Sequence, residues 1–343
     1  MIPVTAEIRQ VPPWQTALAQ AITEPAELLR VLGLGARWQV AAERAASAFP
    51  LRVPRGFVAR MASGDPYDPL LRQVLPLAEE LLDTPGYSTD PVGDSVARQA
   101  PGVLHKYAGR VLLTATGACA VHCRYCFRRH FPYANENASA DQWRDALAYI
   151  AADPTVHEVI LSGGDPLMLS DRRLADFVSA LAACAHVRRL RVHTRLPVVL
   201  PERVTRGLIQ LLTSTRLSAV VVIHANHANE LDDAVRAACA RLRAGGITLL
   251  NQSVLLRGVN DNVEALTALS EALFKAGVLP YYLHLLDRVQ GAAHFEVSAS
   301  AAVQLHQQLA GCLPGYLVPR LVREQPGADS KTWLADGFAM IEP

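Results

Sequence analysis

The chain has 343 residues, of which 50% are hydrophobic and 19% are charged, and its formal net charge is +1. This composition excludes a chain that is disordered throughout, and it provides enough apolar material for one large domain or two. A nearly neutral chain also lacks the broad basic field that holds nucleic acid or an anionic membrane surface. We therefore expect neither nucleic acid nor a membrane among its partners.

Residues 1–105 are rich in alanine and leucine and are interrupted by prolines, which predicts a helical N-terminal region without strands. Short helices are expected over 14–22 and 25–32, the second with Pro25 at its first helical position. The stretch from Met1 to Arg9 lacks a basic segment followed by an apolar run, so we expect no signal peptide. Because no run of about 18 apolar residues could cross a membrane, the prediction is a cytoplasmic protein.

From residue 106 to residue 312, short β-branched runs alternate with helical stretches. Six such units with buried strands predict the α/β class, with a parallel sheet curled into a partial (βα)6 barrel. Functional residues of such sheets gather at the C-terminal ends of the strands. The final segment, 313–343, shows no regular pattern. The expected strands span 110–116, 156–162, 190–195, 219–224, 247–255 and 280–285, and the expected helices span 141–152, 171–184, 203–212, 229–243, 262–275 and 299–310.

Three of the six cysteines, Cys119, Cys123 and Cys126, follow the first of these strands with the spacing Cys-x3-Cys-x2-Cys. Structural zinc sites use four ligands and commonly paired Cys-x2-Cys knuckles, but no second knuckle exists here, and His122 and His130 lack a usual ligand spacing. Three thiolates on a four-iron cube leave one iron open for the amino and carboxylate groups of S-adenosylmethionine (SAM). This spacing resembles the radical SAM superfamily, which implies a [4Fe-4S] cluster and a 5′-deoxyadenosyl radical.

Further motifs fit the same resemblance. The second expected strand is followed by Gly163, Gly164 and Asp165. This stretch is similar to the superfamily motif that binds the SAM amino group. Glycine lets a backbone approach a ligand closely. His224 and Gln252 match superfamily positions that contact SAM. The remaining cysteines are expected to be small buried apolar residues, because free cysteine is usually buried and a cytoplasmic chain rarely relies on disulfides: Cys184, Cys239 and Cys312.

Lys331, one of only three lysines, lies on a Gly/Ser-rich loop near the end of the chain. Such a lysine can form a Schiff base with an aldehyde cofactor. Together with the cysteine loop, it resembles the lysine 2,3-aminomutase family, whose cofactors are the cluster, SAM and pyridoxal 5′-phosphate (PLP). The resemblance runs from about residue 100 to Thr332, and it is closest to the short bacterial branch that makes β-lysine for elongation factor P. The matching stretches include 128–129, 162–167, 224–230, 251–261, 280–287 and 291–295.

The resemblance implies a role for each candidate residue. Lys331 is the catalytic residue that carries PLP, and Arg128 binds the substrate carboxylate through its bidentate fork. Asp287 and Glu324 pair with the distal ammonium of a lysine substrate. A reductant such as flavodoxin or ferredoxin and a functional link to elongation factor P and its ligase are expected, and a homo-oligomer is allowed. The PLP phosphate is assigned to Lys106, Tyr107 and Arg110.

Two departures from the longer family members stand out. Those members carry a C-terminal cysteine segment that binds zinc, whereas here 12 residues follow Lys331 and none is cysteine, so structural zinc is not expected. The longer type also has an aspartate where Glu324 stands. Alternatives to a lysine substrate are arginine or glutamate, of which two acidic pocket residues disfavour glutamate. A non-catalytic iron–sulfur redox regulator is disfavoured by the open-iron spacing, the glycine motif and Lys331.

Overall fold

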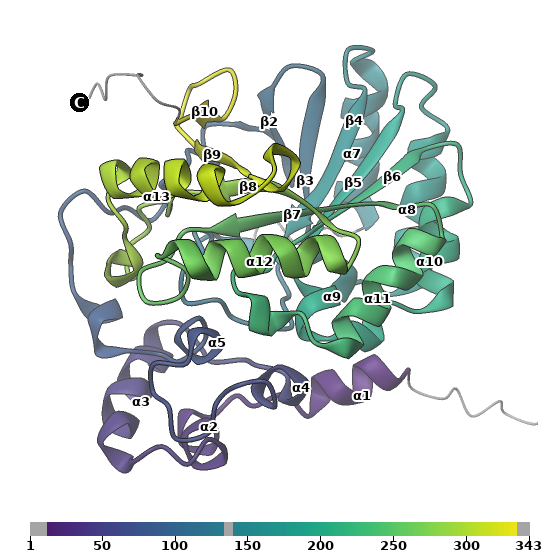
Figure 1. Cartoon of the computed structure of the whole chain (residues 1–343). Helices are drawn as coiled ribbons and strands as arrows, with labels where there is room; N and C mark the ends of the chain where they lie inside the picture. Colours follow the sequence, from purple (N-terminus) through teal and green to yellow (C-terminus); the bar gives the residue numbers. More distant parts are fainter. Residues whose placement is uncertain (1–11, 134–139, 335–343) are drawn as a thin grey trace, which may run out of the picture.

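A computed structural model describes residues 12–133 and 140–334 of the chain. They contain one curved sheet of ten strands, in which every strand lies beside its neighbours in chain order (Figure 1). Neighbouring strands from β3 to β9 pair in parallel, as the predicted barrel requires. These strands are β3 (Arg110–Thr116), β4 (Glu158–Gly163), β5 (Arg189–Thr194), β6 (Ser218–Ile223), β7 (Thr248–Val254), β8 (Leu279–His284) and β9 (Arg320–Arg323).

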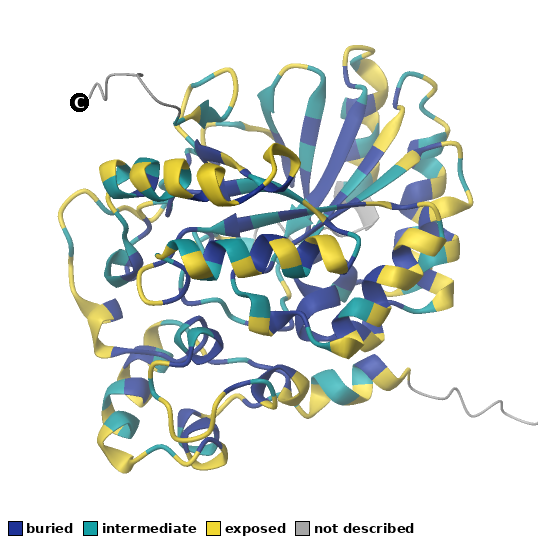
Figure 2. Ribbon diagram, viewed as in Figure 1, coloured by how far each residue is buried: buried dark blue, intermediate teal, exposed yellow. Residues whose placement is uncertain are grey.

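Each crossover between these parallel strands contains an α-helix of at least eight residues. Polar residues cap several of these helices; for example, the Asp232 carboxylate accepts a hydrogen bond from the Val235 N–H at 2.9 Å. The helices turn apolar faces to the sheet and exposed faces outward (Figure 2). The predicted partial (βα)6 barrel is therefore confirmed. The crossover helices are α7 (Ala140–Ala152), α8 (Asp171–Ala182), α10 (Arg206–Thr213), α11 (Asp233–Ala244), α12 (Val263–Lys275) and α13 (Ala299–Cys312).

Two regions differ from the prediction, because short strands leave little periodic signal. β1 (Arg98–Ala100) and β2 (Val103–Tyr107) extend the sheet antiparallel to β3, in a region predicted to contain no strands. At the other edge, β9 and β10 (Thr332–Trp333) lie in the segment predicted to have no regular pattern. The buried Leu321 and Val322 anchor β9 beside β8, and β10 returns the chain so that Lys331 faces the sheet's C-terminal side.

The N-terminal helices lie against the segments that follow the strands. α4 (Arg55–Val58) contacts α9 (Leu196–Val199) after β5, and the short helix η2 (Ala78–Leu81) contacts η6 (Ala293–Phe295) after β8. The N-terminal region therefore covers the C-terminal side of the barrel, below the sheet in Figure 1. The remaining helices described in this region are α1 (Pro13–Ala19), α2 (Pro25–Val31), η1 (Ala36–Trp38), α3 (Gln39–Ala48) and α5 (Pro69–Arg72).

Among the three scattered cysteines, only Cys239 is buried as predicted. Cys184 is half-buried, and Cys312 is exposed as the last residue of α13. Among the described residues, no helix is long and apolar enough to cross a lipid bilayer. The expectations for Met1 to Arg9 and for the residues after Leu334 fall outside the described ranges.

Candidate active site

A cavity of about 400 Å³ lies at the C-terminal ends of the parallel strands. Its volume is that of a small-molecule or cofactor site. Every residue that the sequence assigned to the site lines it, although these residues come from strands and loops spread over more than two hundred positions of the chain. They are Lys106, Tyr107, Arg110, Cys119, Cys123, Cys126, Arg128, Gly163, Gly164, Asp165, His224, Gln252, Asp287, Glu324 and Lys331.

Two glycines at the end of β4, Gly163 and Gly164, allow close contact with the start of the cysteine loop. The Gly164 N–H donates to the Thr116 carbonyl at 2.6 Å, and the Asp165 N–H donates to the Ala118 carbonyl at 2.8 Å. A Cβ on Gly164 would lie 2.4 Å from the Ala118 carbonyl oxygen, and Gly163 adopts a φ of +114° that disfavours other residues. These glycines therefore position the cysteine loop against the end of β4.

Asp165 is engaged by the protein itself. Its carboxylate accepts hydrogen bonds from the Thr194 hydroxyl at 2.7 Å and from the Arg195 N–H at 2.7 Å. Burial raises the pKa of Asp165 to about 6, although these hydrogen bonds favour the charged form. Asp165 thus connects the end of β4 to the end of β5.

His224 and Gln252 also contact each other on the cavity wall. Their side-chain nitrogens lie 2.8 Å apart. Burial lowers the pKa of His224 to about 3, so its imidazole is neutral.

The three loop cysteines face the same cavity, and burial disfavours the ionised form of Cys119 and Cys126. Burial raises the pKa of Cys126 to about 11, and the nearby Cys123 adds to the rise; burial and both neighbouring thiols likewise raise the pKa of Cys119. Three thiols that face one cavity are the kind of donor set that a four-iron cube takes, since each thiolate binds a different iron.

Buried ion pairs attach the cysteine loop to the N-terminal region. Glu80 of η2 accepts hydrogen bonds from Arg124 Nε at 2.8 Å and from Arg129 Nη2 at 2.8 Å. The exposed fractions of the Arg124 and Glu80 side chains are 0% and 1%. Removing one partner would leave an unpaired buried charge, which costs about 3–5 kcal/mol. Sequence reasoning missed Glu80, because its partners lie more than forty residues away in the chain.

Arg128, the predicted carboxylate ligand, is held in place by a residue that the sequence did not reveal. Its Nε donates to Asp94 Oδ2 at 2.8 Å and its Nη1 donates to the Ser162 hydroxyl at 3.2 Å. The other Asp94 oxygen lies 2.8 Å from Lys106 Nζ. Asp94 therefore joins two cationic side chains of the cavity, while Arg128 retains further N–H groups for a ligand. Asp94 lies in an irregular loop, where no motif marked it.

Lys331 and Glu324 form a close ion pair in the segment between β9 and β10. Glu324 also accepts a hydrogen bond from the Tyr107 hydroxyl at 2.8 Å and lies 3.5 Å from Lys106 Nζ. Burial alone would raise the pKa of Glu324, but the two ammonium groups outweigh it and lower the pKa to about 2. Of the predicted phosphate ligands, Lys106 and Tyr107 are thus already engaged by protein groups.

Asp287 and Arg110 are different, because no hydrogen bond or ion pair is found for either side chain among the described residues. The Arg110 guanidinium lies 4.8 Å from the centre of the Tyr107 ring. Burial raises the pKa of Asp287 to about 7, and the charge of Lys331 offsets only part of this rise. The Arg110 guanidinium and the Lys331 amine line the same cavity, and they suit the phosphate and the aldehyde of PLP, respectively. The unpaired Asp287 carboxyl can accept a cationic ligand.

Comparisons with known proteins agree with this arrangement. The model of the Radical SAM superfamily matches residues 113–269. The L-lysine 2,3-aminomutase of Escherichia coli is 52% identical over 93% of this chain and 93% of its own length. That of Haemophilus influenzae is 47% identical over 98% of this chain and 99% of its own. That of Clostridium subterminale is 33% identical over 96% of this chain and 79% of its own.

Proposed function

Since the chain belongs to the lysine 2,3-aminomutase family of radical SAM enzymes, we propose that it converts L-lysine to β-lysine by a 1,2-amino shift. The cofactors are a [4Fe-4S] cluster, SAM and PLP. One observation carries the proposal: a single cavity is lined by the three loop cysteines, by Lys331, and by the charged residues Arg128 and Asp287, which suit the two ends of a lysine. The enzyme is thus an isomerase.

A 1,2-amino shift needs cofactor chemistry because the hydrogen on C3 of an amino acid is not acidic. When bound, the cluster with SAM supplies a carbon radical that can take this hydrogen, and PLP supplies delocalisation for the radical that remains. The protein's tasks are to orient the substrate and to exclude water from the radical. Cys119, Cys123 and Cys126 would hold the cluster, and Lys331 would hold PLP until substrate displaces it.

Arg128 would bind the substrate carboxylate. The Arg128 side chain is 6% exposed, and Asp94 and Ser162 hold its guanidinium from one side. Because the Arg128 side chain is already fixed, less conformational entropy is lost when the substrate binds. Because Arg128 follows Cys126 by two residues, it would place the substrate beside the source of the radical.

Asp287 would bind the distal ammonium of lysine. At neutral pH, with a pKa of about 7, this carboxyl is part protonated in the absence of a cation. An arriving ammonium favours the ionised form, so binding of lysine would release a proton from Asp287. Glu324 would contribute less to the substrate ammonium, because Lys331 and Lys106 already neutralise it.

Two finer aspects belong to the same proposal. A one-electron carrier such as flavodoxin or ferredoxin would reduce the cluster. The similarity to the short bacterial family members supports β-lysine as a product destined for elongation factor P and its ligase.

The proposal is tested by anaerobic incubation of the reconstituted protein with SAM, PLP, dithionite and one amino acid at a time. Chiral analysis should find β-lysine from lysine, and little or no β-product from arginine or glutamate. Faster turnover of arginine than of lysine would reject the substrate assignment while retaining the family. Absence of any β-amino acid, with cluster and PLP both bound, would reject the proposed reaction.

A further inference from the structure

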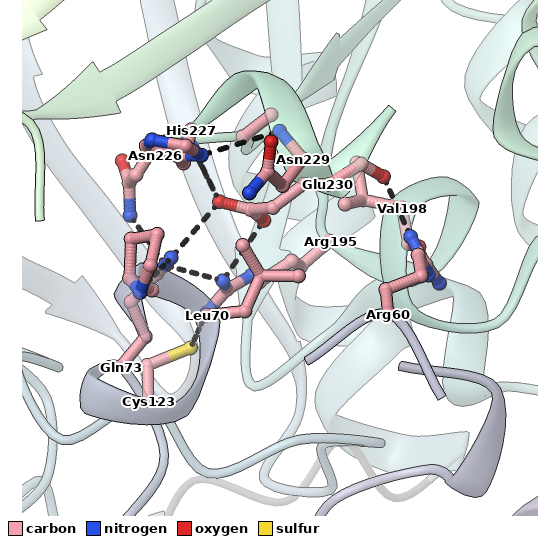
Figure 3. A network of polar contacts seen from close by, with 12 residues as sticks. Arg60, Leu70, Gln73, Cys123, Arg195, Val198, Asn226, His227, Asn229 and Glu230 are labelled. Atoms are coloured by element: carbon pink, nitrogen blue, oxygen red, sulfur yellow. Dashed lines mark hydrogen bonds and ion pairs between the residues drawn. The ribbon is translucent and has the colours of Figure 1, made fainter. Parts of the chain in front are cut away.

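A buried polar network lies behind the cysteine loop and reaches one of its thiols (Figure 3). Arg195 follows β5, and its Nη1 donates to Cys123 Sγ at 2.7 Å. Its Nη2 donates to Gln73 Oε1 at 2.6 Å and to Glu230 Oε2 at 3.1 Å. The Arg195 side chain is 5% exposed and the Glu230 side chain is 0% exposed. No motif in the sequence marked Arg195.

Glu230 is held at its other oxygen as well. Its Oε1 accepts hydrogen bonds from Gln73 Nε2 at 3.0 Å and from the backbone N–H of Asn226 at 2.8 Å. Arg60 donates to the Glu230 carbonyl at 2.6 Å. The Arg195 guanidinium is thereby fixed between a carboxylate, an amide and a cysteine sulfur. It cannot turn to solvent, because the rings of Phe57 and Tyr125 lie over it.

We propose that Arg195 sets the reduction potential of the cluster through its hydrogen bond to Cys123, and that Glu230 limits the size of this effect. The inference rests on the proposed function, in which Cys123 is a cluster ligand. Arg195 is a positioning residue, since it acts through that cysteine rather than on substrate or SAM.

The physical reason is the change of charge on reduction. The cluster accepts one electron from a one-electron carrier and passes from the 2+ to the 1+ state, so its thiolates become more negative. A fixed cationic donor at a thiolate stabilises the reduced state more than the oxidised state, and hydrogen bonds to cluster sulfur are an established control of potential. Glu230 opposes the effect because its carboxylate offsets part of the guanidinium charge. The two residues should therefore shift the potential in opposite directions.

The experiment measures the midpoint potential of the reconstituted full-length protein by anaerobic spectroelectrochemistry. In Arg195→Gln, the ratio of reduced to oxidised cluster at the wild-type midpoint should fall about tenfold, which corresponds to a shift of about 59 mV to more negative potential. Arg195→Lys keeps the charge but cannot reach all three partners, so it should shift less in the same direction. Glu230→Gln should shift the midpoint to more positive potential.

Arg203 provides a matched control. Its side chain is also fully buried and paired, with Nη2 2.7 Å from Asp171 Oδ1, but it does not line the cavity. Arg203→Gln should leave the midpoint unchanged in every molecule that retains four irons. Iron content and the number of cysteine ligands, measured spectroscopically, separate a change in potential from a loss of cluster.

The outcomes are distinct. Unchanged midpoints, or shifts of the same sign in Arg195→Gln and Glu230→Gln, would overturn the inference. If Arg195→Gln loses iron, the other two variants test the inference. It then requires a midpoint potential that is more positive in Glu230→Gln and more negative in Arg195→Lys. Loss of iron from all three variants would also overturn it, since the network would then act on cluster assembly. A wild-type protein that binds no cluster would contradict the proposed function itself.

Discussion

The cavity has a cysteine side, around Cys119, Cys123 and Cys126, and a lysine side, around Lys331, and the two sides are built differently. On the cysteine side, charged residues are paired within the protein: Glu80 pairs with Arg124 and Arg129, and Glu230 pairs with Arg195. On the lysine side, Lys331 is paired with Glu324, but Arg110 and Asp287 have no ionic partner in the described part of the chain. The cysteine side is thus fixed before any ligand binds, whereas the lysine side keeps charges for ligands to pair.

Asp94 connects these two sides, because one of its oxygens pairs with Arg128 and the other with Lys106. In the proposed reaction, the radical source would be held rigid relative to the substrate, whereas the lysine that carries PLP would exchange its partner. Substitutions on the two sides should therefore fail in different ways.

The largest expected effect is at the cysteine side. Replacing Cys119, Cys123 or Cys126 with alanine should abolish SAM cleavage, because each removes one of only three ligands and the cluster is then lost. Iron content and release of 5′-deoxyadenosine measure this. Cys312→Ala is the matched control, since Cys312 is exposed and should not affect iron content. A fourth cysteine ligand detected in the wild-type cluster would contradict this ligand set.

On the lysine side, Lys331→Ala should prevent covalent attachment of PLP and leave the cluster intact. Borohydride reduction of the wild-type protein, followed by peptide mapping, should find the pyridoxyl group on Lys331. Lys275→Ala is the control, because Lys275 is exposed at the end of α12. Lys106→Ala should weaken PLP retention without removing its visible absorption band. A pyridoxyl group on Lys106 or Lys275 would refute the assignment.

Asp287→Asn should raise the KM for lysine and lower kcat/KM about tenfold to hundredfold, because a buried ammonium that loses its charged partner costs about 1–3 kcal/mol. Glu324→Gln should raise the KM less, since that carboxylate is already neutralised by protein cations. Cluster and PLP spectra should remain unchanged in Asp287→Asn. Wild-type kinetics in this variant would remove Asp287 from the substrate site.

Asp94→Asn should weaken both substrate binding and PLP retention, but less than the preceding substitutions do. The asparagine keeps a hydrogen-bond acceptor for Arg128 but loses the charge that orients it, at a cost of roughly 1 kcal/mol, or about fivefold in KM. PLP retention should also fall, because Lys106 loses its closest carboxylate. A change confined to one of the two readouts would show that Asp94 does not couple the two sides.

Asp287 also predicts a pH dependence of the KM for lysine. Asp287 has a raised pKa of about 7, so its carboxylate is protonated below that pH and ionised above it. The groups facing it are Lys331, Glu324, Lys106 and Asp94. The KM for lysine should therefore fall about tenfold as the pH rises from about 6 to about 8, and Asp287→Asn should remove this fall. An unchanged slope in the variant would assign the titration to another group.

The sequence was sufficient for the barrel and for the residues around the cavity, but not for the contacts that hold those residues. The parallel strands from β3 to β8 were predicted within two residues at each end, because buried β-branched runs of that length have a strong signal. β1, β2, β9 and β10 were missed because they are short. Glu80, Asp94 and Arg195 were missed because a long-range ion pair leaves no local pattern: Arg195 and Gln73, for example, are 122 positions apart.

If the cysteine side and the lysine side serve one reaction on one bound substrate, a hydrogen on C3 of lysine must pass to the adenosyl group. Incubation of the holoenzyme with lysine deuterated at C3 tests this most directly, by mass spectrometry of the adenosyl group and of the product. We expect deuterium at the 5′ carbon of the adenosyl group together with formation of β-lysine, and an about tenfold to hundredfold slower appearance of both signals in Asp287→Asn at low lysine concentration. Formation of β-lysine without any deuterium in the adenosyl group would contradict it.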